Sequence, residues 1–258
     1  EISECLVGSE MCIRDRHIKK EMDTFCDETG FETYKVAPKA FLQWTKFVAA
    51  AIFLSVVVCL VLVYTNVFSG VGGNDFFVPQ CIVGGVVAVG LFITVMEFLL
   101  YKQFVDVFYK KTEGHNFYAK RAPKGEVKRR IIISGHCDAA YEWRHIYYTK
   151  KLHMPHLMGI LMGWTIGGAV ISVIVAVITI IANFVNMGAF GDFMLNYSYY
   201  FHCLTALGMV PLFLFVDFKT LSPGANDNLT GTYAAVCAMR MLDMAGVELE
   251  NTELVAMI

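Results

Sequence analysis

Residues 130–140 read RIIISGHCDAA, and this stretch decides how the rest of the chain is interpreted. Three consecutive β-branched isoleucines after a charged lead-in predict a short, fully buried strand, which Ser134 and Gly135 end. His136 and Asp138 therefore follow a strand end, where open α/β sheets gather their ligands. A metal-bound imidazole needs an acceptor for its second ring nitrogen, and a carboxylate two residues on supplies one. Solvated loop residues at strand ends have the same composition, so the pair alone leaves both interpretations open.

A second polar loop lies far downstream, at residues 222–231, and reads SPGANDNLTG. It places Asp227 immediately before a pattern typical of a helix over residues 230–245, with Gly246 as its C-terminal cap. The buried face expected for this helix comprises Ala234, Cys237, Ala238, Met241 and Leu242. Residues 252–258, TELVAMI, predict a further buried strand. The two polar loops thus border buried elements, as the residues of a site in an α/β fold do.

The order of the two motifs resembles that of the di-zinc exopeptidases, metallopeptidase family twenty-eight. In that family H-x-D follows a hydrophobic strand, and P-G-A-N-D-N-x-x-G precedes an alanine-rich helix, as they do here. The resemblance implies that His136 binds one zinc ion, that Asp138 is the catalytic residue that orients it, and that Asp227 bridges both metals. It also implies an α/β fold, a zinc-exopeptidase-like mixed sheet with flanking helices. It covers three stretches, residues 17–36, 112–140 and 219–258.

The family's Glu-Glu pair, which follows the strand at residues 252–258, is absent, as are a further Asp or Glu and a final His. Glu248, Glu250 and Glu253 do not match the position of the pair. In the family the first Glu is the general base and the second is a zinc ligand. Two zinc ions lower the pKa of a shared water and clamp both oxygens of the tetrahedral intermediate. We therefore expect this chain to be an incomplete, N-terminal part of such an enzyme, which binds zinc weakly and does not itself hydrolyse peptides.

Composition indicates a membrane protein. Hydrophobic residues make up 56% of the chain and charged residues 17%, where soluble domains have about 25% charged. Residues 47–66 and 78–96 carry no charge, and each is long enough to cross a hydrocarbon core of roughly 30 Å as a helix. A third span is expected within residues 157–190 and a fourth at residues 199–216. The fold is therefore expected to be interrupted by two transmembrane helical hairpins, with about four spans.

Small and polar residues in and near the last two segments predict how these helices pack. Gly159, Gly163 and Gly167 lie on one face at a spacing that lets another helix approach closely. His202 has no acidic partner at helical spacing, so we interpret it as a packing residue and not as a metal ligand. Trp143 precedes the third segment, and two interpretations are open for it, the lining of a substrate pocket and a position at the membrane interface.

Charge predicts the topology, because short loops without basic residues are the ones that translocate. All 21 Lys and Arg lie outside the loops at residues 67–77 and 191–198, so we expect a multi-pass integral membrane protein with its peptidase-like domain on the cytoplasmic side.

Cys5 to Arg16, CLVGSEMCIRDR, resembles translated library-adapter sequence and is excluded from the fold argument. The expected parts are residues 1–16, an artefact; 17–46, the N-terminal helix and strand of the soluble domain; 47–100, a transmembrane hairpin; 101–155, the first half of the peptidase-like domain; 156–216, a second transmembrane hairpin; and 217–258, the truncated second part of that domain.

Two further patterns concern the soluble parts. Residues 17–29 predict an amphipathic helix, and residues 31–36 alternate as a half-buried strand does. Residues 116–121 and 127–134, on either side of the turn-like Pro123-Lys124-Gly125, predict a β-hairpin that leads to the site.

These observations lead to one functional hypothesis and an alternative. The first is a membrane-bound zinc-dependent aminopeptidase, which hydrolyses the N-terminal peptide bond with a two-zinc-activated water and is present here as a fragment. Its cofactor is Zn²⁺, two per complete site, and its partners are a peptide substrate and the lipid bilayer. The alternative is a non-catalytic membrane protein that retains the peptidase scaffold for binding. A transporter has less support, because the spans contain no charged pair. No nucleic-acid partner is expected at a net charge of −2, and the oligomeric state is left open.

Overall fold

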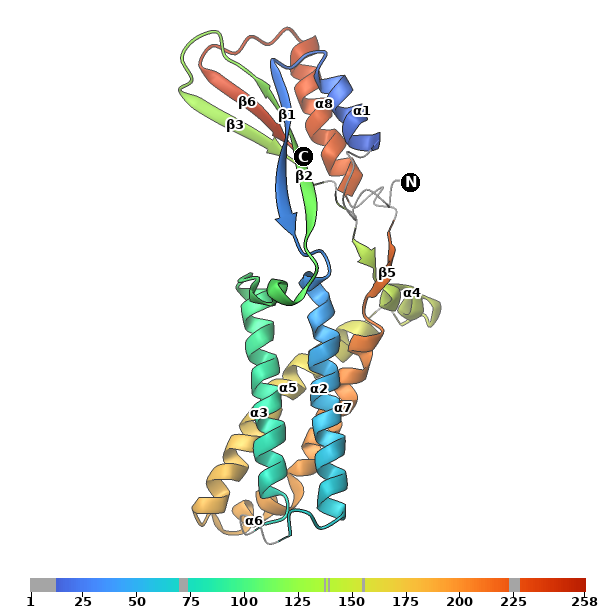
Figure 1. The fold of residues 1–258 in the computed structure, drawn as a ribbon, viewed down its shortest axis with the longest axis vertical. Helices are drawn as coiled ribbons and strands as arrows, with labels where there is room; N and C mark the ends of the chain where they lie inside the picture. The colour runs from blue at the N-terminus through green and yellow to red at the C-terminus, as the bar shows by residue number, and fades with distance from the viewer. Residues whose placement is uncertain (1–12, 70–73, 137, 139, 155, 223–227) are drawn as a thin grey trace. The chain divides into compact units, whose positions relative to one another are not determined.

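A computed structural model describes residues 13–69, 74–136, 138, 140–154, 156–222 and 228–258 (Figure 1). The chain divides into two compact units, each assembled from segments that are distant in the sequence. The first, called the sheet unit, comprises Glu1–Pro38, Tyr109–Glu142 and Phe218–Ile258. The second, called the helical unit, comprises Lys39–Phe108 and Trp143–Asp217.

The sheet unit contains a mixed four-stranded sheet in the order β1-β2-β6-β3. Strand β1 (Glu28–Val36) pairs antiparallel with β2 (Thr112–Arg121), which in turn pairs antiparallel with β6 (Thr252–Met257). Strand β3 (Arg129–Ser134) pairs in parallel with β6. The mixed α/β sheet expected from the sequence is therefore present.

Two predictions about β3 are wrong. Residues 116–121 and 127–134 form strands but no hairpin, because β6 lies between β2 and β3 and pairs with both. The strand is also not fully buried, since it lies at the edge of the described sheet, where Ile131 and Ile132 are 49% and 56% exposed. A run of β-branched residues predicts a strand, but it does not determine how many neighbours the strand has.

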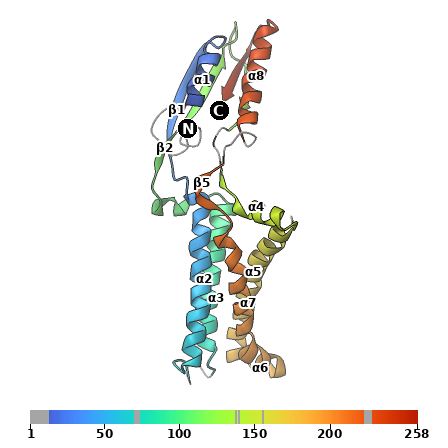
Figure 2. The ribbon, with the colours of Figure 1, turned by 90° about the vertical axis from the view of Figure 1, so that its right-hand side faces the viewer.

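Helices α1 (Ile13–Met22) and α8 (Thr230–Met244) pack on one face of this sheet (Figures 1 and 2). Strand residues two apart point to the same face, so alternate side chains of β2 and β6 meet the helices. The buried contacts include Ile18, Met22, Val236, Met239, Phe117, Ala119, Leu254 and Ala256. The helix predicted over residues 17–29 is corrected to α1, which includes the last residues of the segment excluded as an artefact, and β1 begins at Glu28.

The helix predicted over residues 230–245 is observed as α8, but its buried face differs from the prediction. The buried residues are Thr232, Ala235, Val236 and Met239. Ala234 and Cys237, which were predicted to be buried, are exposed, and Met241 is 70% exposed. Apolar residues occur on several sides of this helix, so the 3.6-residue period is compatible with more than one face. Gly246 has a φ of +63° and follows the helix end, as predicted for a cap glycine.

Cys26 lies between α1 and β1, and burial raises the pKa of its thiol to about 11, from 9.0. The thiol ionises at lower pH in the unfolded chain than in the folded one, so we expect the free energy of unfolding to fall as pH rises from 9.0 to about 11.

The raised pKa also predicts slow alkylation, because the reaction needs the thiolate. At pH near 8, Cys26 should react far more slowly with iodoacetamide than the exposed Cys237. Mass spectrometry of labelled peptides measures both rates. Equal rates would contradict the prediction.

The helical unit is built from α2 (Ala40–Tyr64), α3 (Phe77–Thr94), α5 (Leu157–Phe184) and α7 (Tyr199–Phe213). Neighbouring helices pack in the order α2-α3-α5-α7, and α7 also packs on α2 (Figure 1). The other elements of this unit are the π-helix η3 (Val95–Leu99), the 3-10 helix η4 (Phe104–Phe108), α4 (Arg144–Lys151) and α6 (Gly188–Tyr197). A second sheet, of the two strands β4 (Tyr141–Glu142) and β5 (Asp217–Leu221), belongs to the sheet unit except for Asp217.

Among the described residues, three helices are long and apolar enough to cross a membrane: α2, α3 with η3, and α5. They coincide with the first three predicted spans. Large apolar side chains face outward, as lipid-facing helices require, and Phe47 and Leu54 are 64% and 57% exposed. The fourth predicted span forms α7, whose 15 residues extend about 23 Å at 1.5 Å per residue, less than the hydrocarbon core.

The predicted glycine stripe is not a packing surface within the described chain. A Cβ atom added at Gly159, Gly163 or Gly167 would meet nothing within 4 Å. The close approach occurs elsewhere, because a Cβ at Gly84 in α3 would lie 2.5 Å from the Cβ of Ala176 in α5. Four-residue spacing permits close approach but does not say which face has a neighbour.

A polar cluster connects three helices inside this unit. His202 of α7 is fully buried, and its Nε2 donates to Oε1 of Gln80 in α3 at 2.5 Å. Its Nδ1 accepts from the hydroxyl of Ser172 in α5, also at 2.5 Å. The Gln80 amide in turn donates to the Ser198 hydroxyl at 2.6 Å. Both ring nitrogens of His202 are therefore occupied by side chains of neighbouring helices, which agrees with a packing role.

Replacing His202 with alanine is expected to destabilise the helical unit by about 1–3 kcal/mol, because Gln80 and Ser172 lose a buried partner. Denaturation of the chain in detergent measures the difference. The matched control is His156→Ala, since His156 is exposed and makes no side-chain capping bond at the start of α5. A His202→Ala protein as stable as the control would exclude this role for the cluster.

Candidate functional site

The candidate site begins where the end of β3 meets the first turn of α8. A Cβ atom at Gly135 would lie 2.7 Å from both the carbonyl carbon and the carbonyl oxygen of Gly231. The Thr232 hydroxyl donates a hydrogen bond to the carbonyl oxygen of His136 at 3.1 Å. The absence of a side chain at Gly135 therefore permits the contact that holds His136 beside the start of α8.

His136 and Asp138 form the pair predicted from their spacing. Nδ1 of His136 lies 2.8 Å from Oδ1 of Asp138, and each side chain is 67% exposed. An ionised carboxylate only accepts hydrogen bonds, so this contact assigns the proton of the neutral ring to Nδ1. The lone pair of Nε2 is then available as an acceptor or as a metal ligand, and the imidazole is accessible from solvent.

Asn228 also contacts this imidazole, a contact that the sequence motifs did not predict. Its side-chain nitrogen lies 2.8 Å from Nδ1 of His136 and also contacts Nε2. Because the same amide nitrogen contacts both ring nitrogens, it lies against the ring and not along the lone pair of one of them. The available signal was position, because Asn228 is the last Asn of the NDN motif and directly precedes the helical pattern. The two sequence motifs therefore meet at His136.

The described donors fit part of a zinc site. One imidazole with a carboxylate on its second nitrogen is the usual arrangement of a histidine ligand of zinc. Zinc binds histidine nitrogen at about 2.0–2.1 Å, so the Asn228 amide, which contacts Nε2, would have to move away when the ion binds. Among the described residues, no three His, Cys, Asp or Glu side chains are grouped so as to hold a metal ion. Asp227, predicted to bridge the two metals, lies outside the described residues.

Comparisons of the chain with models of protein families, with curated proteins and with solved structures find no match in any of the three. The class is therefore defined by the molecule's own features. In the part of the chain that the structure describes, it has three helices of membrane-spanning length and a mixed α/β sheet unit. That unit carries an exposed His-Asp pair at a strand end.

Proposed function

We propose that this chain belongs to a membrane-bound zinc-dependent aminopeptidase, a hydrolase that removes N-terminal residues from peptides. The observation that supports the proposal is the meeting of two distant motifs at one imidazole. Asp138 contacts Nδ1 of His136, and Asn228 of the NDN loop contacts the same ring. If His136 and Asp138 were only solvated polar residues of a loop, there would be no reason for the second motif to contact them. That motif lies more than 90 residues further along the chain.

Each residue has a separate role in this proposal. His136 binds zinc through Nε2, while Asp138 retains the proton on Nδ1 and prevents the ring from turning. Gly135 and Thr232 hold the backbone of His136 at the start of α8. By the family resemblance, Asp227 would be the ligand shared by the two metals. Bound zinc supplies a Lewis acid for the peptide carbonyl and lowers the pKa of water.

The proposed topology places the sheet unit on the cytoplasmic side of the bilayer. Its support is the absence of Lys and Arg from the loops at residues 67–77 and 191–198. In this proposal α7 is the fourth crossing, and its packing against α2 and α5 within the helical unit supports that assignment. Four crossings leave His136 and the NDN loop on the same side, as the proposed site requires.

The test uses the natural full-length protein, purified in detergent. Zinc is removed with a chelator and restored, and hydrolysis of leucine p-nitroanilide is followed by absorbance. We expect activity that is lost with the metal and regained with it. The N-acetylated substrate is the matched control, because an aminopeptidase requires a free amino group and should leave it intact.

Two results would oppose the proposal. Equal hydrolysis of the acetylated substrate would indicate a different peptidase class. Zinc-independent peptide binding without any hydrolysis would favour the alternative, a non-catalytic membrane protein that uses the scaffold for binding.

A further inference from the structure

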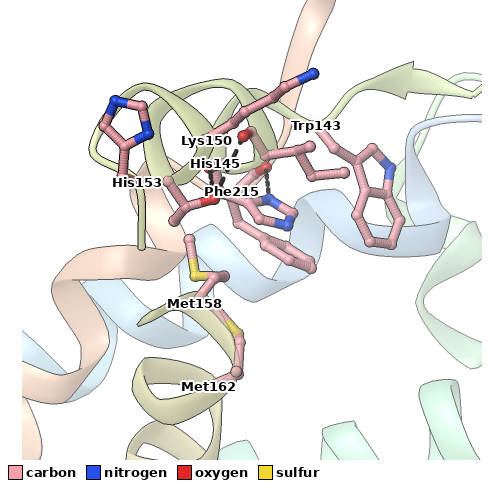
Figure 3. Close-up of a pocket in the computed structure, with 10 residues that line it drawn as sticks. Trp143, His145, Lys150, His153, Met158, Met162 and Phe215 are labelled. Atoms are coloured by element: carbon pink, nitrogen blue, oxygen red, sulfur yellow. Dashed lines mark hydrogen bonds between the residues drawn. The ribbon is translucent and has the colours of Figure 1, made fainter. Parts of the chain in front are cut away.

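The helical unit contains a hollow of about 850 Å³ between α4 and the first turns of α5. This volume is in the range of small-molecule sites, roughly 300–1,000 Å³. Figure 3 shows Trp143 and His153 at opposite ends of the lining, with Met158 and Met162 below His145. The hollow belongs entirely to the helical unit and involves none of the residues of the proposed zinc site.

One wall of the hollow is held by ring contacts. The imidazole of His145 is stacked on the Phe215 ring with 4.8 Å between centroids and 19° between planes. Nδ1 of His145 also lies 3.0 Å from the carbonyl oxygen of Phe215. Trp143 packs on Phe215 with its centroid 5.1 Å away. These contacts fix three aromatic side chains before any ligand arrives, so binding costs little ordering entropy there.

The opposite end is formed by the turn after α4. His153 occupies the left-handed region with a φ of +53°, at the position after the helix cap where glycine is usual. Its N–H donates to the carbonyl oxygen of Lys150 at 3.1 Å, and that of Met154 donates to Thr149 at 2.9 Å. A non-glycine residue costs free energy in this conformation.

The lining is divided between charged and apolar ends. Lys150 and His153 line the hollow beside the turn, and its ten lining residues include no Asp or Glu. Arg144 at the start of α4 is paired with Asp217, whereas Lys150 has no salt bridge within the described part of the chain. Figure 3 shows the Lys150 ammonium on the far side of His145 from Met158 and Met162. The hollow therefore offers positive charge at one end and apolar surface at the other.

The position of the hollow relative to the bilayer follows from the helices that form it. Met158 and Met162 lie in the first two turns of α5, which begins at Leu157 and is long and apolar enough to cross a membrane. The short helix α4 before it carries Lys150 and Lys151 in its last turn, together with exposed Ile146 and Tyr147. Basic, aromatic and apolar side chains on a short amphipathic helix are typical of the lipid headgroup region.

From this geometry we infer that the hollow binds an anionic glycerophospholipid. Its phosphate contacts the Lys150 ammonium, and the upper part of an acyl chain lies along Met158 and Met162. A lipid matches the lining better than a soluble phosphate does, because it occupies the apolar end as well as the charged end. Trp143 then lies at the membrane interface, one of the two interpretations that the sequence left open.

The test measures quenching of tryptophan fluorescence by brominated phosphatidylglycerol, with the full chain in nanodiscs of phosphatidylcholine. Lys150→Ala should weaken retention of phosphatidylglycerol about five-fold to tenfold, since a basic residue near the bilayer surface contributes about 1 kcal/mol. Lys151→Ala is the matched control, because it removes the same charge from the next residue, which does not line the hollow. Equal effects of the two variants would overturn the inference.

A second pair of variants tests the apolar end without disturbing the fold. A Cβ atom at Gly159 or at Gly163 meets nothing within 4 Å, but only Gly159 lines the hollow. Gly159→Phe should therefore reduce quenching by brominated lipid at least several-fold, and Gly163→Phe should leave it unchanged. Equal quenching in the two would contradict lipid binding here. Displacement of the brominated lipid by millimolar inorganic phosphate would also overturn the inference, in favour of a soluble phosphate ligand.

Discussion

Replacing His136 with alanine is expected to reduce the proposed zinc-dependent aminopeptidase activity by more than about 100-fold. Loss of the carboxylate partner of a metal-bound histidine alone costs about 10–100-fold in affinity or activity, and loss of the ligand itself costs more. Asp138→Asn should accordingly lower zinc affinity about 10–100-fold. The uncharged amide replaces the carboxylate that accepts a hydrogen bond from Nδ1 of His136 at 2.8 Å, so it orients the ring less strongly. Asp227→Asn should abolish activity if this residue bridges the metals. Metal content and the rate of leucine p-nitroanilide hydrolysis measure these effects.

The matched control for this series is His17→Ala. His17 lies on α1 in the same unit and is exposed, so its replacement removes a histidine without touching the H-x-D motif. We expect its zinc content and activity to stay within about two-fold of the parent, as for an ordinary surface substitution. A His136→Ala protein that keeps full activity, or an Asp227→Asn protein that does, would exclude the proposed zinc site.

Introducing a single methyl group at Gly135 is expected to destabilise the sheet unit by about 1–3 kcal/mol, the usual cost of overpacking. The added Cβ would lie 2.7 Å from the carbonyl group of Gly231 and 2.9 Å from the nitrogen of Thr232. These are backbone atoms, which cannot rotate away as a side chain can. The end of β3 or the start of α8 must then move, so Gly135→Ala should also weaken zinc binding through His136. Hydrogen exchange of the α8 and β6 amides measures the stability of this unit.

Gly231→Ala is the control, since it lies on the other side of the same contact. A Cβ atom at Gly231 meets nothing within 4 Å, and alanine favours the helix by about 1 kcal/mol relative to glycine. We therefore expect slower amide exchange in Gly231→Ala and faster exchange in Gly135→Ala. If the two substitutions change the amide exchange rate in opposite directions, the close contact of Gly135 with Gly231 explains the difference. Equal destabilisation by both would contradict the close approach of β3 to α8.

Local patterns predicted most elements of this chain, but they did not predict how the strands pair. Residues 116–121 and 127–134 have the composition of two strands joined by a turn, which is typical of a hairpin. In the fold β6 lies between them, because a strand more than 100 residues away in sequence pairs with both. The exposure of Ile132 has the same origin, since the burial of a strand depends on its neighbours and not on its own side chains.

In the candidate site too, local patterns predict contacts between near neighbours but not those between distant segments. The spacing of His136 and Asp138 predicts their contact, because residues two apart after a strand end lie within reach of each other. The contact of Asn228 with the same ring could not be predicted from spacing, because it depends on where the end of β3 meets α8. Gly135 gives a partial signal, but a glycine after a strand is equally typical of a plain turn.

By itself, the sequence determined the membrane character of the chain, its three long apolar helices, most strands and the His136-Asp138 pair. These features depend on composition, on the 3.6-residue and two-residue periods, and on contacts between near neighbours. Only the tertiary structure decided the position of β6, the buried face of α8, the contact of Asn228 with His136, and the hollow beside α5. The physical reason is that these features arise where distant segments meet. The free energy gained by burying apolar surface between such segments selects one pairing among several that local patterns allow.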